Sequence, residues 1–250
     1  MVVRHGILRT AGFVLAAAVL MAVSACAGKY RPDEPAPPAT PFAPKPADAA
    51  VKVVDYGFTS IPLGGDEWAL SYGIVLENVS ATAAAVLTRV EVTATTSSGE
   101  QIAGTLVFSD QRYLPPGATT GVGRTVPAAD LGLDELPADL SLKVGTRDWW
   151  PPENDTWDVP ALTTSDVVLT RGGDGGDDVG FTGTVDGGGP KTIGSMSALF
   201  RDDAGRIIGG AYCPDVEGGL GLTSGPLSMR LEWGAPEDTA RTEVFLNAYF

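Results

Sequence analysis

Short segments in which apolar and polar residues alternate constrain this 250-residue chain more than any other feature. The apolar positions of these segments are Leu70, Tyr72, Ile74 and Leu76; Val90, Val92 and Ala94; Leu140, Leu142 and Val144; Leu227, Met229, Leu231 and Trp233; and Val244, Leu246 and Ala248. A period of two puts apolar side chains on one face of a strand, although Val75 breaks it. Turn signals such as Gly64-Gly65, Ser97-Ser98-Gly99 and Pro115-Pro116-Gly117 separate the segments. We therefore expect an all-β chain of antiparallel β-sandwiches, with a helical turn only between Ala128 and Leu136.

Two stretches of the chain look like copies of each other. Residues 90–104 are followed 106 positions later by the similar residues 196–210. The segment 149–160, WWPPENDTWDVP, interrupts the strand pattern with prolines and acids. The sequence therefore predicts one sandwich domain at 51–148, a Trp/Pro-rich linker at 149–160 and a second sandwich domain at 161–250, each about the size of an immunoglobulin-like domain.

The run from Ala198 to Gly209, with its Asp202-Asp203-Ala204-Gly205 turn, resembles the FxLYD-type immunoglobulin-like domains of bacterial surface lipoproteins. The strand that ends at Asn78 and the Pro116-Gly117 turn fit the same pattern. Two positions depart from it: Arg201 stands where an aromatic residue is common, and the first copy has Thr96-Ser97-Ser98-Gly99 in place of the Asp-led turn. The resemblance implies two tandem immunoglobulin-like domains outside the cytoplasm, and no catalytic residues.

The first 25 residues have the parts of a secretory signal peptide. Arg4 and Arg9 precede thirteen uncharged residues, Ala11 to Val23, which are too few for a membrane-spanning helix. Val23-Ser24-Ala25-Cys26 resembles a bacterial lipobox, which implies cleavage between Ala25 and Cys26 and a diacylglyceryl group, usually with a further acyl chain such as palmitate, on Cys26. Two or more acyl chains hold a protein durably on a membrane. The alternative is an ordinary cleaved signal in which Cys26 has no special role.

The mature chain would begin with a tether at residues 26–50. Residues 27–50 contain seven prolines and almost no large apolar side chains, so this segment cannot bury enough surface to fold. Proline favours an extended conformation. We therefore expect a spacer that lifts the folded part off the extracytoplasmic face of a bacterial cell membrane.

Charge and residue counts exclude several classes of function. Removal of residues 1–25 takes away two arginines and no acid, which changes the net charge from −14 to −16. Such a chain repels phosphate backbones, so we expect no nucleic-acid partner. The one histidine, His5, lies in the signal, which excludes Ser-His-Asp and Cys-His catalysis and His-ligated metals in the mature protein. We therefore expect no enzyme and no cofactor apart from the lipid on Cys26.

Two segments carry candidate binding residues. Residues 172–179, GGDGGDDV, fit one copy of a calcium-binding repeat, so Asp174, Asp177 and Asp178 are weak calcium candidates beside the simpler interpretation of an acidic loop. Trp149, Trp150 and Trp157 crowd into nine residues. They are candidates for contact with a ligand, a glycan or a partner, although large aromatic rings more often pack between domains.

Carboxylates and one thiol complete the candidates. Asp202-Asp203 and the group Glu153, Asp155 and Asp158 could act as acid and base only if one member were desolvated. Aspartates in turns far more often stabilise the turn. With Cys26 lipidated, Cys213 is the one remaining thiol, so it either packs as a small apolar residue or pairs between chains.

These observations predict a membrane-anchored, non-catalytic lipoprotein that presents two sandwich domains to an unidentified protein or envelope partner. The first alternative is a lipoprotein that binds a small ligand or glycan at the interdomain tryptophans. The second alternative is a carboxylate-dependent hydrolase.

Overall fold

The computed structural model describes residues 45, 47–102, 106–151, 161–172, 176–186, 193–213 and 224–248. By its contacts the chain divides after Thr40, and all the described residues belong to the second unit, Pro41–Phe250. Within them the fold is all-β and antiparallel, with twelve strands and one short helix. The fold class predicted from the alternating segments is therefore confirmed.

The first half of this unit contains six strands in two three-stranded sheets. Its elements are β1 (Val51–Gly64), β2 (Glu67–Asn78), β3 (Ala84–Thr95), β4 (Leu106–Leu114), β5 (Thr119–Pro127), α1 (Ala128–Leu131) and β6 (Asp139–Trp150). One sheet has the order β1-β2-β5 and the other the order β4-β3-β6. The predicted helical turn thus forms only over α1, and Gly132 ends it in the left-handed region at φ 65°.

The second half repeats this topology. Its strands are β7 (Ala161–Thr170), β8 (Asp178–Asp186), β9 (Ile193–Arg201), β10 (Ile207–Cys213), β11 (Gly225–Arg230) and β12 (Arg241–Ala248). They form sheets of order β7-β8-β11 and β10-β9-β12, which is the order of the first half with six added to every strand number. The alternating segment that begins at Leu227 ends as a strand at Arg230, so Leu231 and Trp233 lie in the turn that follows.

The repeat extends to the turns after β3 and β9. Gly99 N–H donates to the Thr96 carbonyl at 2.9 Å, and Gly205 N–H donates to the Asp202 carbonyl at 2.9 Å. The first residue of each turn also caps it with a side-chain oxygen, Thr96 Oγ1 in one copy and Asp202 Oδ1 in the other. Threonine therefore replaces aspartate without a change of turn, because both side chains offer an acceptor at the same place.

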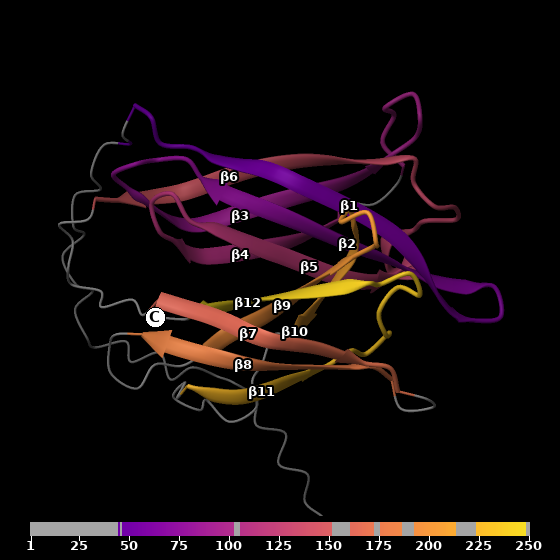
Figure 1. The fold of residues 1–250 in the computed structure, drawn as a ribbon. Coiled ribbons are helices and arrows are strands. Elements are labelled where there is room, and N and C mark those ends of the chain that lie inside the picture. The colour runs from indigo at the N-terminus through magenta and orange to yellow at the C-terminus, as the bar shows by residue number, and fades with distance from the viewer. Residues whose placement is uncertain are drawn as a thin grey trace, which may run out of the picture. The chain divides into compact units, whose positions relative to one another are not determined.

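The contacts between strands stack the sheets in the order β4-β3-β6, β1-β2-β5, β10-β9-β12 and β7-β8-β11. In Figure 1 the strands of the first half lie above those of the second. The first core lies between the first two sheets and contains Leu70, Tyr72, Ile74 and Leu76 of β2. The second core lies between the last two sheets and contains Phe181 of β8 and Phe200 of β9. The two middle sheets therefore have a core on one face and the other half of the unit on the opposite face.

A buried asparagine holds the loops of the first half together. Asn78, at the end of β2, is fully buried, and its Nδ2 donates to the carbonyl oxygens of Ala83 and Leu114 at 2.8 and 3.0 Å. Its Oδ1 accepts the N–H of Ser80 at 3.0 Å. Because loop backbones that are buried need such partners, this asparagine fixes both the β2–β3 and the β4–β5 connections.

Candidate functional site at the junction of the two halves

Glycines line the junction between the sheets β1-β2-β5 and β10-β9-β12. They are Gly57, Gly73, Gly121 and Gly123 on the first sheet and Gly209 and Gly210 on the second. A Cβ atom added at Gly73 would lie only 2.6 Å from the carbonyl oxygen of Gly209. None of the six has a positive φ, so the lack of space, and not an unusual backbone conformation, requires glycine here.

Side-chain hydroxyls complete the contact between these backbones. Ser71 Oγ donates to the carbonyl oxygen of Gly210 at 3.1 Å and accepts the N–H of the same residue at 3.0 Å. Thr125 Oγ1 donates to that carbonyl at 2.8 Å. Because β10 is an edge strand of its described sheet, these two hydroxyls satisfy backbone groups that have no strand neighbour on that side.

Arg201 of the second half forms an ion pair with a residue of the first half. Its Nη1 lies 2.7 Å from Asp55 Oδ2 of β1, its Nε lies 3.1 Å from Glu243 Oε1 of β12, and its side chain is only 11% exposed. Burial alone would lower the pKa of Arg201, but the hydrogen bond to Asp55 and the charge of Glu243 outweigh it and raise the pKa. An aromatic residue at position 201 could not bridge two carboxylates in this way.

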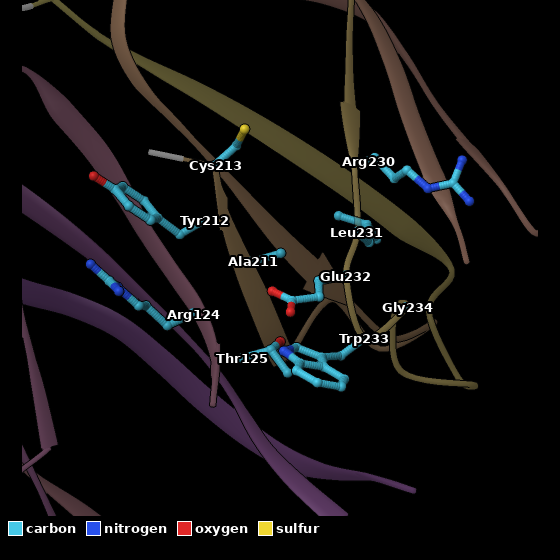
Figure 2. A pocket seen from close by; sticks show the side chains of 10 residues that line it. All are labelled: Arg124, Thr125, Ala211, Tyr212, Cys213, Arg230, Leu231, Glu232, Trp233 and Gly234. Carbon is cyan, nitrogen blue, oxygen red and sulfur yellow. The ribbon is translucent and has the colours of Figure 1, made fainter. Parts of the chain in front are cut away.

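A pocket of about 630 Å³ opens at the same junction (Figure 2). Its walls are residues 124–125 of β5, residues 211–213 of β10, and residues 230–234 at the end of β11 and in the turn that follows. Residues of both halves therefore form it. In Figure 2, Arg124 and Tyr212 extend together on one side of the pocket, whereas Glu232 and Trp233 lie on the other.

Arg124 is the principal charged group on its side of the pocket. Its guanidinium carbon lies 4.2 Å from the centroid of the Tyr212 ring, which is a cation–π contact. Its Nε is inaccessible to solvent and has no hydrogen-bond partner within the described part of the chain. Arg230 also contributes to the wall, but it points away from the other lining side chains and lies 3.7 Å from Asp178.

The tryptophans predicted as contact residues lie elsewhere. Trp149 is 7% exposed and belongs to the first core, where the ammonium of Lys45 stands 5.7 Å from its ring centroid. Trp150 is half-buried, and its ring centroid lies 6.4 Å from that of Tyr113. Both belong to β6, which extends two residues into the predicted linker 149–160. Trp157 lies outside the described residues.

Trp233 is the aromatic residue that sequence reasoning missed. In the alternating pattern it is the last inward-facing position of a strand, but the strand ends three residues earlier and Trp233 lies half-buried in the pocket wall. The signal was present in the neighbouring Gly234-Ala235-Pro236, because glycine and proline directly after an apolar position mark a turn.

Asp177 is surrounded by hydrogen-bond donors. Its Oδ1 accepts Gly172 N–H at 3.1 Å, and its Oδ2 accepts Arg171 Nη1 and Ala235 N–H, each at 2.9 Å. Burial alone would raise the pKa of Asp177, but these donors together lower it. A carboxylate so occupied fixes the turn at Ala235 and leaves few lone pairs for a cation.

The remaining acidic candidates do not gather into one site where the structure describes them. Asp178 faces Arg230, and Asp174 lies outside the described residues. Over the described ranges no group of three or more acidic, cysteine or histidine residues could hold a metal ion. Asp202 pairs with Arg206 at 2.6 Å; Glu153, Asp155 and Asp158 lie outside the described residues.

The structure describes one of the two cysteines, Cys213. Cys213 is half-buried in the pocket wall, and its sulfur is visible in Figure 2. Ala25 and Cys26 lie outside the described residues.

In the part of the chain that the structure covers, no helix is long and apolar enough to cross a membrane. No family model, curated protein or solved structure matches this chain.

Proposed function

We propose that this chain is a non-catalytic lipoprotein, anchored by a lipid on Cys26 to the extracytoplasmic face of a bacterial membrane. It presents two immunoglobulin-like sandwiches to a protein or to another component of the envelope. The sequence supports the anchor through the signal-like residues 1–25, the lipobox-like Val23-Ser24-Ala25-Cys26 and the proline-rich tether.

The observation that carries the presentation role is the tight junction between the halves. Glycine backbones in contact, the Ser71–Gly210 hydrogen bonds and the Arg201 bridge leave no room for the halves to slide against each other. A pair of sandwiches held in this way offers its outer sheets in a fixed relation, which reduces the entropy lost when a partner binds.

The outer strands supply a suitable contact surface. Along β6 the exposed residues are Asp139, Ser141, Lys143, Gly145 and Arg147, and along β7 they include Thr163, Ser165 and Thr170. Both strands are sheet edges in the described topology. Polar and charged edge residues keep such strands soluble while they remain available to a partner. The acidic balance of the chain favours a partner with a basic surface.

Membrane fractionation tests the anchor. Wild type should enter the membrane fraction and leave it on addition of detergent, whereas Cys26→Ala should remain soluble outside the membrane or stay unprocessed. Cys213→Ala is the matched control and should fractionate like wild type. Retention of processed Cys26→Ala in the membrane would refute the lipid anchor.

Crosslinking on intact cells tests the partner. Lys143 is 81% exposed on β6, so an amine-reactive crosslinker at this position should capture a specific neighbour. The neighbour should be lost when Asp139 on the same strand is replaced by arginine, which repels a basic partner and leaves the Lys143 amine in place. An equal charge change at Asp203, in the exposed turn after β9, should leave the neighbour. Equal recovery with all variants would argue against contact through β6.

A further inference from the structure

The junction pocket has the size and the location of a small-molecule site. Its volume of about 630 Å³ lies within the range of roughly 300–1,000 Å³ that is common for such sites. Both halves of the unit line it, and binding sites often lie where two units meet. The pocket depends only on the docked halves, so a ligand can bind there whether or not Cys26 carries a lipid.

Arg124 prepares one side of the pocket for an anion. Arg124 lies opposite Tyr72 in the β2–β5 pairing, and its guanidinium extends from β5 to the ring of Tyr212 on β10. Stacking on a ring occupies one face of the guanidinium and leaves its N–H donors in the plane, where they can meet a carboxylate. Its Nε is inaccessible to solvent, so a ligand in the pocket would meet the terminal Nη groups of the guanidinium.

The opposite side of the pocket fits a hydroxylated ring. Trp233 offers an indole, and Glu232 beside it offers an exposed carboxylate (Figure 2). An indole face packs well against the C–H face of a pyranose ring, while a carboxylate accepts hydrogen bonds from hydroxyl groups. Glu232 and Arg124 lie on different sides of the pocket, so an anionic group near Arg124 is kept away from the carboxylate.

We propose that this pocket binds a carboxylated sugar of the uronic-acid class. The sugar carboxylate accepts N–H donors of Arg124, the C–H face of the ring packs on Trp233, and a ring hydroxyl donates to Glu232. A neutral sugar would leave the guanidinium without an anion, and an aromatic acid without hydroxyls would leave Glu232 without a donor. The combination of the three side chains therefore selects an acidic sugar over both.

Calorimetric titration of the full chain in detergent with sodium glucuronate, and in parallel with glucose, tests this inference. Glucuronate should bind with a Kd of about 5 mM or tighter, and glucose should bind at least ~10-fold more weakly. Arg124→Gln should weaken glucuronate binding ~10-fold or more. Arg147→Gln, which removes an exposed arginine 3.5 Å from Asp148 on β6, should bind like wild type.

Two further variants keep the test decisive if Arg124→Gln fails to fold. Arg124→Lys retains the charge but loses the planar fork, and it should weaken binding severalfold in a protein with a wild-type melting temperature. Trp233→Leu should weaken glucuronate and glucose by the same factor, because both sugars use the indole. Equal affinity for glucuronate and glucose, or no saturable heat below about 50 mM glucuronate, would overturn the inference.

Discussion

Ser71 Oγ both donates to and accepts from the backbone of Gly210, at 3.1 and 3.0 Å, although 139 residues separate the two in the chain. Ser71 is fully buried, so no water can replace either bond. The two halves therefore contact each other through a small hydroxyl that bonds to a backbone. A larger side chain in place of Ser71 would separate the two strands.

Replacement of Ser71 by alanine should therefore destabilise the protein by about 1–3 kcal/mol, because the Gly210 N–H loses its acceptor in a buried place. Urea unfolding followed by circular dichroism measures the change. Ser141→Ala, at an exposed position of β6, should stay within about 0.5 kcal/mol of wild type. If both variants were equally stable, Ser71 would not hold the junction.

Two glycine-to-alanine substitutions should have different effects on the stability of the protein. Gly73→Ala places a Cβ 2.6 Å from the Gly209 carbonyl and 2.8 Å from Ile207 Cγ2, and it should cost about 1–3 kcal/mol through overpacking. Gly145→Ala meets no atom within 4 Å and has no positive φ, so it should be neutral or stabilise by up to about 1 kcal/mol. Thermal melting of the two variants measures the contrast. A stable Gly73→Ala protein would mean that the sheets do not approach so closely.

Asp177 should make stability depend on pH in the acid range. Its folded-state pKa is lowered, so its contribution is fully present above the unfolded pKa of about 3.9 and is lost as the pH falls through the folded value. Asp177→Asn should be less stable than wild type by about 1–3 kcal/mol at pH 7. The difference should shrink as the pH falls below about 4, in urea titrations at a series of pH values. A difference that stayed constant down to pH 3 would contradict the donor-rich environment.

Replacement of Trp149 and of its neighbour Trp150 by alanine should reduce the stability of the protein by different amounts. Trp149→Ala removes a ring that is 7% exposed in the first core, and it should cost about 3–5 kcal/mol. Trp150→Ala removes a half-buried ring at the strand end and should cost less than about 2 kcal/mol. Guanidinium unfolding of both variants compares them. An equal loss would mean that Trp149 does not pack in the core as the structure places it.

Much of the fold follows from local pattern. Alternation in the segments around Tyr72 and Val92 identifies β2 and β3, because one face of each strand packs on the first core. Glycines such as Gly99 and Gly117, both with positive φ, lie at the turns where the sequence predicts them. These features depend on neighbours in the chain, and the sequence therefore reveals them.

The junction could not be predicted in the same way. Val75 breaks the alternation of β2, and the structure gives the reason: Val75 packs with Leu199 and Ile207 of the other half. Gly73 and Gly123 look like ordinary weak positions in a strand until a second backbone is seen against them. Arg201 gives no sign of its role in the sequence, because its partner Asp55 lies 146 residues away. Contacts between distant segments carry no short-range periodicity.

The sequence did not point to the pocket at the junction. The sequence suggests aromatic contact residues around Trp149, whereas the pocket wall contains Trp233 and depends on Arg124 of the other half. A strand end displaced by three residues was enough to hide Trp233 among core positions.

The composition of the junction has a consequence for the order of synthesis. The face that the first half turns toward the second contains Ser71, Gly73 and Thr125, and its buried apolar side chains include Ile61, Ala69 and Val75. Aromatic side chains such as Tyr72 are instead enclosed in the core of this half. A first half with small and polar residues at this face exposes few large apolar side chains before its copy is made, which lowers the tendency of a growing chain to aggregate.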